Sequence, residues 1–225
     1  MEILLVRHGE SEGNNEEVDP QQNGDYCLNL TATGKKQAKD LGKHIGEDFI
    51  RDALIYSSPY YRTRQTLDGI IQGAGIKSRD ELVIYEDPRL REVEHGFQGT
   101  KDDVKRQKVL LREVHGSFYY RYKGGESPAD CYDRVTTFLE SMRRQMERKN
   151  KDKVFVVSHG LTIRCFVMRF LHLSVEEFDS MDNPDNCSQI RISGIENISE
   201  ERRIFSTRKW AVEGLTLRQS SPPVM

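Results

Sequence analysis

Two short apolar runs constrain the fold of this chain more than any other feature. Residues 3–6 and 154–157 consist entirely of Ile, Leu, Val and Phe, and each run leads within two residues to a histidine followed by glycine. Apolar segments of this length that stop at polar residues are typical of buried strands in a parallel sheet. Ligands bind at the carboxyl ends of such strands, so we expect His8 and His159 to lie at one ligand-binding edge.

Signals for further strands and helices alternate through the rest of the chain. Thr31 is a suitable N-cap, and Ser58-Pro59 and Ser127-Pro128 each place serine at a cap and proline at the first helical position. The other expected elements are short strands at 53–57 and 82–85, a long helix from Pro128 to about Lys149, helices at 161–173 and 175–181, and late strands at 189–192 and 203–210. The alternation predicts an α/β fold, with three layers (α/β/α) around a mostly parallel central sheet.

The same pattern predicts the domain organisation. No linker divides the chain, so we expect a single domain at 1–217 and a disordered tail at 218–225. The region from about Pro88 to Gly125 is rich in polar and aromatic residues. We expect it to form a small helical lobe over the carboxyl ends of the strands.

Composition and charge narrow the classes of partner and location. The 225 residues carry a formal net charge of −2, which gives no reason to expect a nucleic-acid partner. No stretch approaches the roughly 18 unbroken apolar residues of a membrane span, and the run at 3–6 is too short for a secretory signal. The four cysteines show no C-x-x-C spacing. We therefore expect free thiols in a cytoplasmic protein, and we leave open a homodimer formed through the late strands.

The expected edge of the sheet gathers residues suited to phosphoryl chemistry. Arg7 and His8 follow the first strand, and His159 follows the strand at 154–157. Arg62 lies on the helix after the second expected strand, and Glu92 lies in the loop after the third. Arginine binds phosphate oxygens bidentately, imidazole can attack phosphorus, and a carboxylic acid can protonate the leaving oxygen. Arginines can also neutralise the charge of the phosphoryl group without a metal.

Each of these assignments has an ordinary alternative. Arg62 and Arg64 could both be surface charges on a helix. Glu92 has three rivals for the role of the acid, namely Glu10, Glu12 and Glu94. The remaining histidines are expected to be surface or packing residues: His44, His95, His115 and His172. Other phosphate chemistries lack their motifs, because the sequence contains neither a Cys-x5-Arg loop nor a P-loop, and no cluster has convincing metal spacing.

Six blocks of residues, in a fixed order between about residues 3 and 165, carry a family resemblance. They are Leu5-Val6-Arg7-His8-Gly9-Glu10-Ser11 with Asn14; Leu30-Thr31, Gly34 and Gln37-Ala38; Ser57-Ser58-Pro59, Arg62 and Gln65-Thr66; Leu90, Glu92, Gly96 and Gly99; Gly125-Glu126-Ser127; and Val157-Ser158-His159-Gly160. Together they resemble the histidine phosphatase superfamily, in the branch that includes cofactor-dependent phosphoglycerate mutases.

This resemblance implies a site and a reaction. The implied site residues are His8 as the phosphorylated nucleophile, Glu92 as the proton donor, and Arg7, Arg62, His159, Asn14 and Gly160 as the phosphate and substrate pocket. The register of the family's helix selects Arg62 over Arg64. The implied substrate is a small phosphorylated molecule, and no metal and no cofactor are implied.

The insert after the acid separates two reactions within this family. Mutases of the family typically carry a tryptophan and paired arginines there, whereas here the single tryptophan is Trp210. The insert instead has Arg112, Arg121 and Lys123 among tyrosines. This difference favours a phosphatase that passes the phosphoryl group to water. A phosphoglycerate mutase, which is an intramolecular phosphotransferase, is the first alternative, and a non-catalytic binding or scaffold domain is the second.

Overall fold

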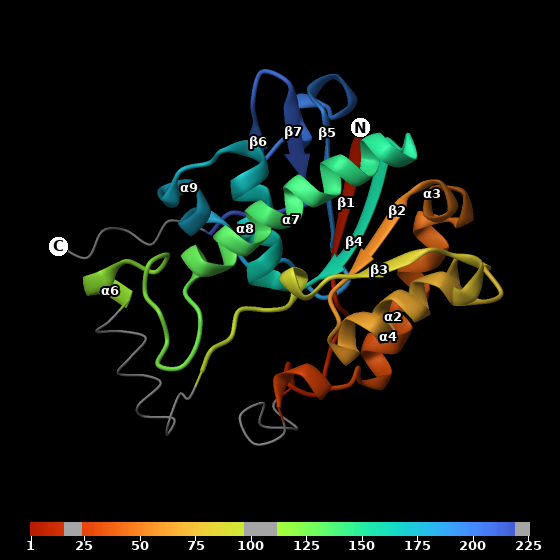
Figure 1. Cartoon of the computed structure of the whole chain (residues 1–225), viewed down its shortest axis with the longest axis horizontal. Coiled ribbons are helices and arrows are strands. Elements are labelled where there is room, and N and C mark those ends of the chain that lie inside the picture. The colour runs from red at the N-terminus through yellow and green to blue at the C-terminus, as the bar shows by residue number, and fades with distance from the viewer. Residues whose placement is uncertain (16–23, 97–111, 219–225) are drawn as a thin grey trace.

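The computed structural model describes residues 1–15, 24–96 and 112–218, and these residues build one seven-stranded sheet between helices (Figure 1). The strands are β1 (Glu2–Arg7), β2 (Leu54–Ser57), β3 (Ile84–Glu86), β4 (Lys153–Ser158), β5 (Gln189–Gly194), β6 (Phe205–Ser206) and β7 (Trp210–Glu213). Their order is β3-β2-β4-β1-β5-β7-β6. The first four strands in this order run parallel, and the last three are antiparallel additions. The predicted α/β class is confirmed.

Helices cover both faces of the sheet (Figure 1). The helices are α2 (Ala32–Ile45), α3 (Glu47–Asp52), α4 (Tyr61–Gly73), α6 (Arg112–His115), α7 (Pro128–Lys149), α8 (Gly160–Leu171) and α9 (Val175–Ser180). Short 3-10 turns are η1 (Asp25–Cys27), η2 (Arg79–Glu81), η3 (Pro88–Leu90), η5 (Ile195–Asn197) and η6 (Glu200–Arg202). None of the described helices is long and apolar enough to cross a bilayer.

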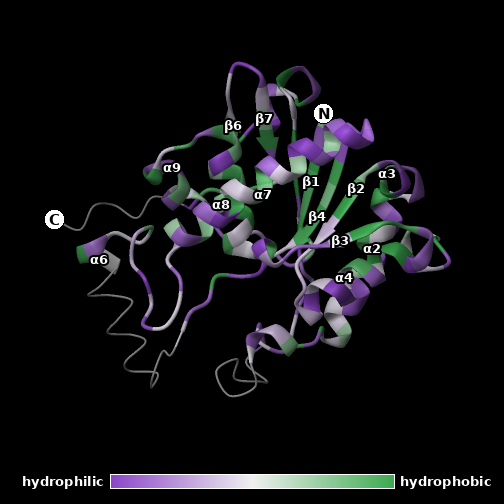
Figure 2. Ribbon diagram, viewed as in Figure 1, coloured by the Kyte–Doolittle hydropathy of each residue, from purple (hydrophilic) through white to green (hydrophobic). Residues whose placement is uncertain are grey.

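Alternation along the central strands produces two separate cores. On β1, Leu4 and Val6 pack with α2, α3 and α4, whereas Ile3 and Leu5 pack with α7 and α8. Successive side chains of a strand point to opposite faces, so the strand is apolar throughout because both faces are buried. Figure 2 shows the strands as a hydrophobic layer between helices whose outer surfaces are hydrophilic. The three-layer arrangement predicted from the sequence is therefore present.

The register of the parallel strands sets the position of the site. β1 pairs with β4 so that Arg7 lies opposite Ser158, and the backbone N–H of His8 donates to the carbonyl oxygen of Ser158 at 3.0 Å. β2 lies on the other side of β4, with Ser57 opposite Val157. The residues that follow β1, β2 and β4 therefore meet at one edge.

Two of the three predicted helix starts are confirmed. The Thr31 hydroxyl accepts a hydrogen bond from the backbone N–H of Gly34, and Ser127 forms a capping box with Asp130 at the start of the helix that ends at Lys149. The third prediction was wrong, because α4 begins at Tyr61 and its N-cap is Tyr60. The Ser58 hydroxyl instead contacts His159, as described below.

Other boundaries differ from the prediction. The late segment 203–210 forms a hairpin rather than one strand, because a turn at Thr207 separates β6 from β7. Of the predicted lobe between Pro88 and Gly125, the structure describes η3 and α6, and 97–111 lie outside the described residues. Arg218 donates its backbone N–H to Ser180, and 219–225 are also outside the described residues. The single domain and the disordered tail stay predictions.

Candidate active site

The two histidines that follow β1 and β4 are in contact at the carboxyl edge of the sheet. The ring centroids of His8 and His159 are 5.2 Å apart. Only 3% of His8 and none of His159 is exposed. Because both rings are buried beside each other, they form a pair of inward-facing imidazoles rather than two surface residues.

The hydrogen bonds of His8 define which nitrogen is free to react. Its Nδ1 lies 2.7 Å from the carbonyl oxygen of Gly9, and a carbonyl can only accept, so Nδ1 carries the proton. Nε2 therefore has the lone pair, and it accepts a hydrogen bond from Arg62 Nε at 3.3 Å. Burial, reinforced by the charge of Arg62, holds the pKa of His8 well below its usual value. His8 is thus a neutral base with Nε2 facing a guanidinium group.

Arg62 is buried next to this nitrogen and is fixed by a turn from another part of the chain. Both of its terminal nitrogens bind Asp25: Nη1 donates to Oδ1 at 2.9 Å and to the backbone oxygen at 2.5 Å, and Nη2 donates to Oδ2 at 3.0 Å. Its guanidinium also lies 5.0 Å from the ring centre of Tyr60. Arg64, in contrast, has a side chain that is 39% exposed and pairs with Glu86. The structure therefore places Arg62 in the site and Arg64 outside it.

Arg7 and His159 each bring a buried nitrogen with no protein partner to the same edge. Arg7 Nη1 donates to the carbonyl oxygen of Pro184 at 2.6 Å, but Arg7 Nε has no hydrogen-bond partner among the described residues. His159 Nε2 lies 2.8 Å from the Ser58 hydroxyl, whereas its Nδ1 lacks a partner within the described part of the chain. Buried polar atoms are nearly always paired in native proteins. Two unpaired nitrogens beside His8 indicate a place for a ligand with several acceptor oxygens.

Electrostatics at this edge favour an anion. Burial lowers the pKa of Arg7 from its usual value, an effect that the charge of Glu92 opposes. Burial also holds the pKa of His159 well below its usual value, and the nearby charge of Arg62 adds to this shift. The two guanidinium groups therefore supply the positive charge of the site, while both imidazoles are neutral.

Glu92 lies on the segment after β3 and η3, close enough to Arg7 for its charge to act on the guanidinium group. Its Oε1 accepts hydrogen bonds from the backbone N–H of Val93 at 3.0 Å and from the Thr162 hydroxyl at 3.3 Å. Thr162 also donates to the carbonyl oxygen of Arg91 at 2.7 Å. This contact ties the acid's segment to α8, the helix that begins directly after His159.

The three rival acids have other partners. Glu10 Oε1 accepts from the Thr31 hydroxyl at 2.6 Å, and Glu12 Oε2 accepts from the backbone N–H of Asn29 at 2.9 Å. Both carboxylates thereby connect the turn after β1 to residues 29–31. Glu94 is exposed and accepts from the backbone N–H of Gly96 at 3.1 Å. Glu92, in contrast, contacts Thr162 on α8, the helix that follows His159.

Asn14 and Gly160, the remaining predicted residues, occupy the turn after β1 and the start of α8. Asn14 Oδ1 accepts from the backbone N–H and the hydroxyl of Ser11, both at 3.1 Å, and from Asn186 Nδ2 at 3.2 Å. A Cβ at Gly160 would lie 3.6 Å from Arg7 Nε and 3.3 Å from Asn183. A side chain at Gly160 would therefore contact both the buried Nε of Arg7 and the Asn183 side chain.

Three site residues were missed by sequence reasoning. Ser58 contacts His159, Asp25 binds Arg62, and Asn186 donates to the carbonyl oxygen of His8 at 3.0 Å. The position of Ser58 directly after β2 was the available signal, because that strand ends at the same edge. Asp25 and Asn186 come from loops, and their sequence neighbourhoods carry no comparable signal.

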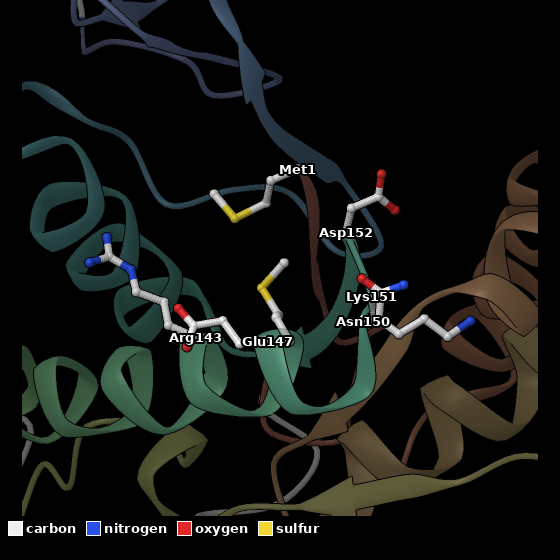
Figure 3. Close-up of a pocket in the computed structure, with 7 residues that line it drawn as sticks. Met1, Arg143, Glu147, Asn150, Lys151 and Asp152 are labelled. Carbon is white, nitrogen blue, oxygen red and sulfur yellow. The ribbon is translucent and has the colours of Figure 1, made fainter.

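Other polar features of the described chain lie elsewhere. No group of three or more His, Cys, Asp or Glu side chains suited to a metal ion occurs within 1–15, 24–96 and 112–218. An open depression of about 540 Å³ is found at the amino-terminal end of β1 and β4, the end opposite to the histidines (Figure 3). It is lined by Met1, Arg143, Met146, Glu147, Asn150, Lys151 and Asp152. Its mixed charges and lack of histidine give it no share in the chemistry described here.

Comparison with known proteins agrees with this geometry. A family model for the histidine phosphatase superfamily (branch 1) matches residues 3–204. The chain belongs to the histidine phosphatase superfamily. A superfamily relative in Arabidopsis thaliana, phosphoglycerate mutase-like protein AT74, is 37% identical over 204 residues, covering 84% of this chain and 63% of that protein. The present chain thus spans less than two thirds of the length of AT74.

Two further superfamily comparisons cover more of the matched protein. Phosphoserine phosphatase 1 of Hydrogenobacter thermophilus is 34% identical over 192 residues, which are 84% of each chain. The solved structure of Bacillus stearothermophilus YhfR superposes with a TM-score of 0.67 at 25% identity, covering 86% of this chain and 91% of that one. The fold is therefore shared along most of the chain.

The buried histidine pair predicts a loss of stability in mild acid. The unfolded chain protonates both rings below about pH 6.5, whereas the folded protein keeps His8 and His159 neutral there. The unfolded state then binds more protons, so the free energy of unfolding falls as the pH decreases. We expect a loss of about 2 to 3 kcal/mol between pH 7.5 and 5.5, measured by urea denaturation without phosphate.

Single variants show whether the pair is responsible. His8→Gln should remove about half of this pH dependence, while His44→Gln, which changes an exposed ring at the end of α2, should leave it intact. Equal free energies of unfolding at the two pH values would contradict the assignment.

Proposed function

We propose that this protein is a phosphomonoesterase that works through a phosphohistidine at His8, without a metal ion or other cofactor. The observation that carries the proposal is the environment of His8 Nε2. Its lone pair accepts from Arg62 Nε, and the adjoining residues bring two buried nitrogens, Arg7 Nε and His159 Nδ1, that have no partner in the described chain. A phosphoryl group is an anion whose several oxygens can accept from all three.

The first step forms a bond from His8 Nε2 to phosphorus and breaks the bond from phosphorus to the ester oxygen. Arg7, Arg62 and His159 hold the phosphoryl oxygens during the transfer. Glu92, protonated, gives its proton to the departing alcohol, so that the product leaves as a neutral hydroxyl compound. Asn14 and Gly160 complete the substrate pocket.

The second step uses water. Glu92, now ionised, removes a proton from a water molecule as its oxygen attacks phosphorus, and the bond to Nε2 breaks. Inorganic phosphate leaves, His8 is again a neutral base, and Glu92 is again protonated. The same carboxyl group therefore acts first as an acid and then as a base.

The positions of two residues favour hydrolysis over mutase activity. Arg121, one of the cations in the insert, is bound by Asp130 at the start of α7. Trp210 packs on Phe170 at the end of the sheet opposite to the histidines. Neither residue is thus positioned to bind the carboxylate of the substrate, as a phosphoglycerate mutase requires.

A substrate assay separates the three candidate functions. In the presence of a metal chelator, we expect the protein to release inorganic phosphate from p-nitrophenyl phosphate. We also expect it to release phosphate from 3-phosphoglycerate without forming 2-phosphoglycerate, even when the bisphosphate is added. Isomerisation without net phosphate release would show a mutase instead. Failure to turn over any member of a panel of phosphorylated metabolites would show a non-catalytic binding or scaffold domain.

The cellular setting is part of the proposal. None of the four cysteines, which all lie in the described residues, forms a disulfide. This is the state expected in a reducing cytoplasm, where we place the protein. A small phosphorylated molecule is the expected partner, and the homodimer stays a prediction.

A further inference from the structure

We propose that the carboxylate of Asp25 is a built-in competitor of the substrate's phosphate, which must displace it from Arg62. The inference rests on the proposed function, because it concerns the same anion site. It assigns to η1 a role in setting the affinity for phosphate and in releasing the product.

The hydrogen bonds of Arg62 make the competition unavoidable. Arg62 Nε faces His8, and both terminal nitrogens bind the two carboxylate oxygens of Asp25. A guanidinium group offers its planar fork to one carboxylate or one phosphate in the same bidentate way. A phosphoryl group on His8 Nε2 needs the donors of this fork, and Asp25 holds them in the free protein.

The two partners are unequally anchored, which decides which one moves. The Arg62 side chain is only 5% exposed and lies on the first turn of α4, whereas the Asp25 side chain is 31% exposed. η1 is a three-residue turn without a side-chain cap, and it follows Gly24 at a φ of 77°. Tyr26, the middle residue of η1, is 59% exposed and meets Tyr61 edge-on, with 6.2 Å between the ring centres. Displacement therefore moves a short solvent-facing turn and leaves the arginine in place.

The exchange also keeps the buried charge of Arg62 neutralised in both states of the site. Removing the partner of a buried ion leaves an uncompensated charge, which is strongly unfavourable. Asp25 compensates Arg62 when the site is empty, and the phosphoryl group does so when the site is filled. When the phosphate is free to leave, Asp25 returns to Arg62 and opposes its rebinding.

The test is the affinity for inorganic phosphate, measured by isothermal titration calorimetry on the full chain. We expect Asp25→Asn to bind phosphate about tenfold more tightly than the wild type, because an amide replaces a charge-assisted bidentate partner with a neutral one. Asp25→Ser should tighten binding in the same direction. The matched control is Asp68→Asn. Asp68 lies further along α4 and pairs with Arg79, so its replacement should leave the affinity for phosphate unchanged.

A double-mutant cycle identifies Arg62 as the shared partner. In an Arg62→Ala background, Asp25→Asn should no longer tighten phosphate binding. Tightening that persists there would mean a general charge effect and would overturn the proposal. Unchanged or weaker binding in Asp25→Asn alone would also overturn it, since Asp25 would then only position the arginine. This test measures equilibrium binding of phosphate and not catalysis. A His8 variant that keeps full turnover would therefore refute the proposed function and leave the affinities of the Asp25 variants unaffected.

Discussion

Replacing His8 with asparagine is expected to reduce phosphatase turnover by at least about 10³-fold, because the attacking atom is lost. The residue is fixed by Gly9 on one side and Arg62 on the other, so the only nitrogen available for attack is Nε2. The measurement is the initial rate with p-nitrophenyl phosphate in the presence of a chelator. Rapid quenching of the wild type with labelled substrate should trap an acid-labile, base-stable phosphoenzyme, and the variant should trap none.

The matched control for this variant is His44→Asn, which changes an exposed histidine in the last turn of α2. It should retain wild-type turnover and the trapped intermediate. Wild-type phosphate release by the His8 variant would refute a phosphohistidine mechanism, whatever else the protein binds.

Replacing Glu92 with glutamine is expected to lower the rate by about 10²- to 10⁴-fold for esters of alkyl alcohols, because the amide cannot donate the proton to the leaving oxygen. The loss should be much smaller for p-nitrophenyl phosphate in the first step, since that leaving group is stable as an anion. The measurement is the ratio of the two rates, in wild type and variant, with a burst experiment to isolate the first step.

Glu94→Gln is the paired control, because Glu94 lies two residues away and is exposed. It should leave both rates near those of the wild type. A uniform loss for both classes of ester in the Glu92 variant would mean that this carboxylate positions the site through Thr162 and Arg7 and does not transfer a proton.

The centre of the fold was predictable because burial on both faces leaves a strong signal. The runs at 3–6 and 154–157 are apolar at every position, which is typical of a strand between two helical layers. Their parallel pairing then fixes the ends of both strands at one edge, and with them the histidine pair. The hairpin of β6 and β7 was harder to predict, because its strands are short and a turn at Thr207 interrupts the alternation.

The site was predictable where its residues directly follow a strand and unpredictable where they come from a loop. Ser58 satisfied the rule for a helix cap, but its hydroxyl is used by His159, and the helix starts after Tyr60 instead. A capping rule that considers only neighbouring residues cannot detect a hydrogen-bond partner 101 residues away. Asp25 is one of several acids in a polar loop, and only the folded chain shows which of them reaches Arg62.

The hydrogen bond from His8 Nδ1 to the Gly9 carbonyl has a consequence for the chemical form of the proposed phosphohistidine. Phosphohistidine exists as two isomers, and a ring that is held by Nδ1 can form only the one phosphorylated on the distal nitrogen. That ring keeps its Nδ1 proton after transfer, so it carries a positive charge and weakens the phosphorus–nitrogen bond. A single backbone oxygen thereby selects the isomer and keeps the phosphoryl group ready to leave.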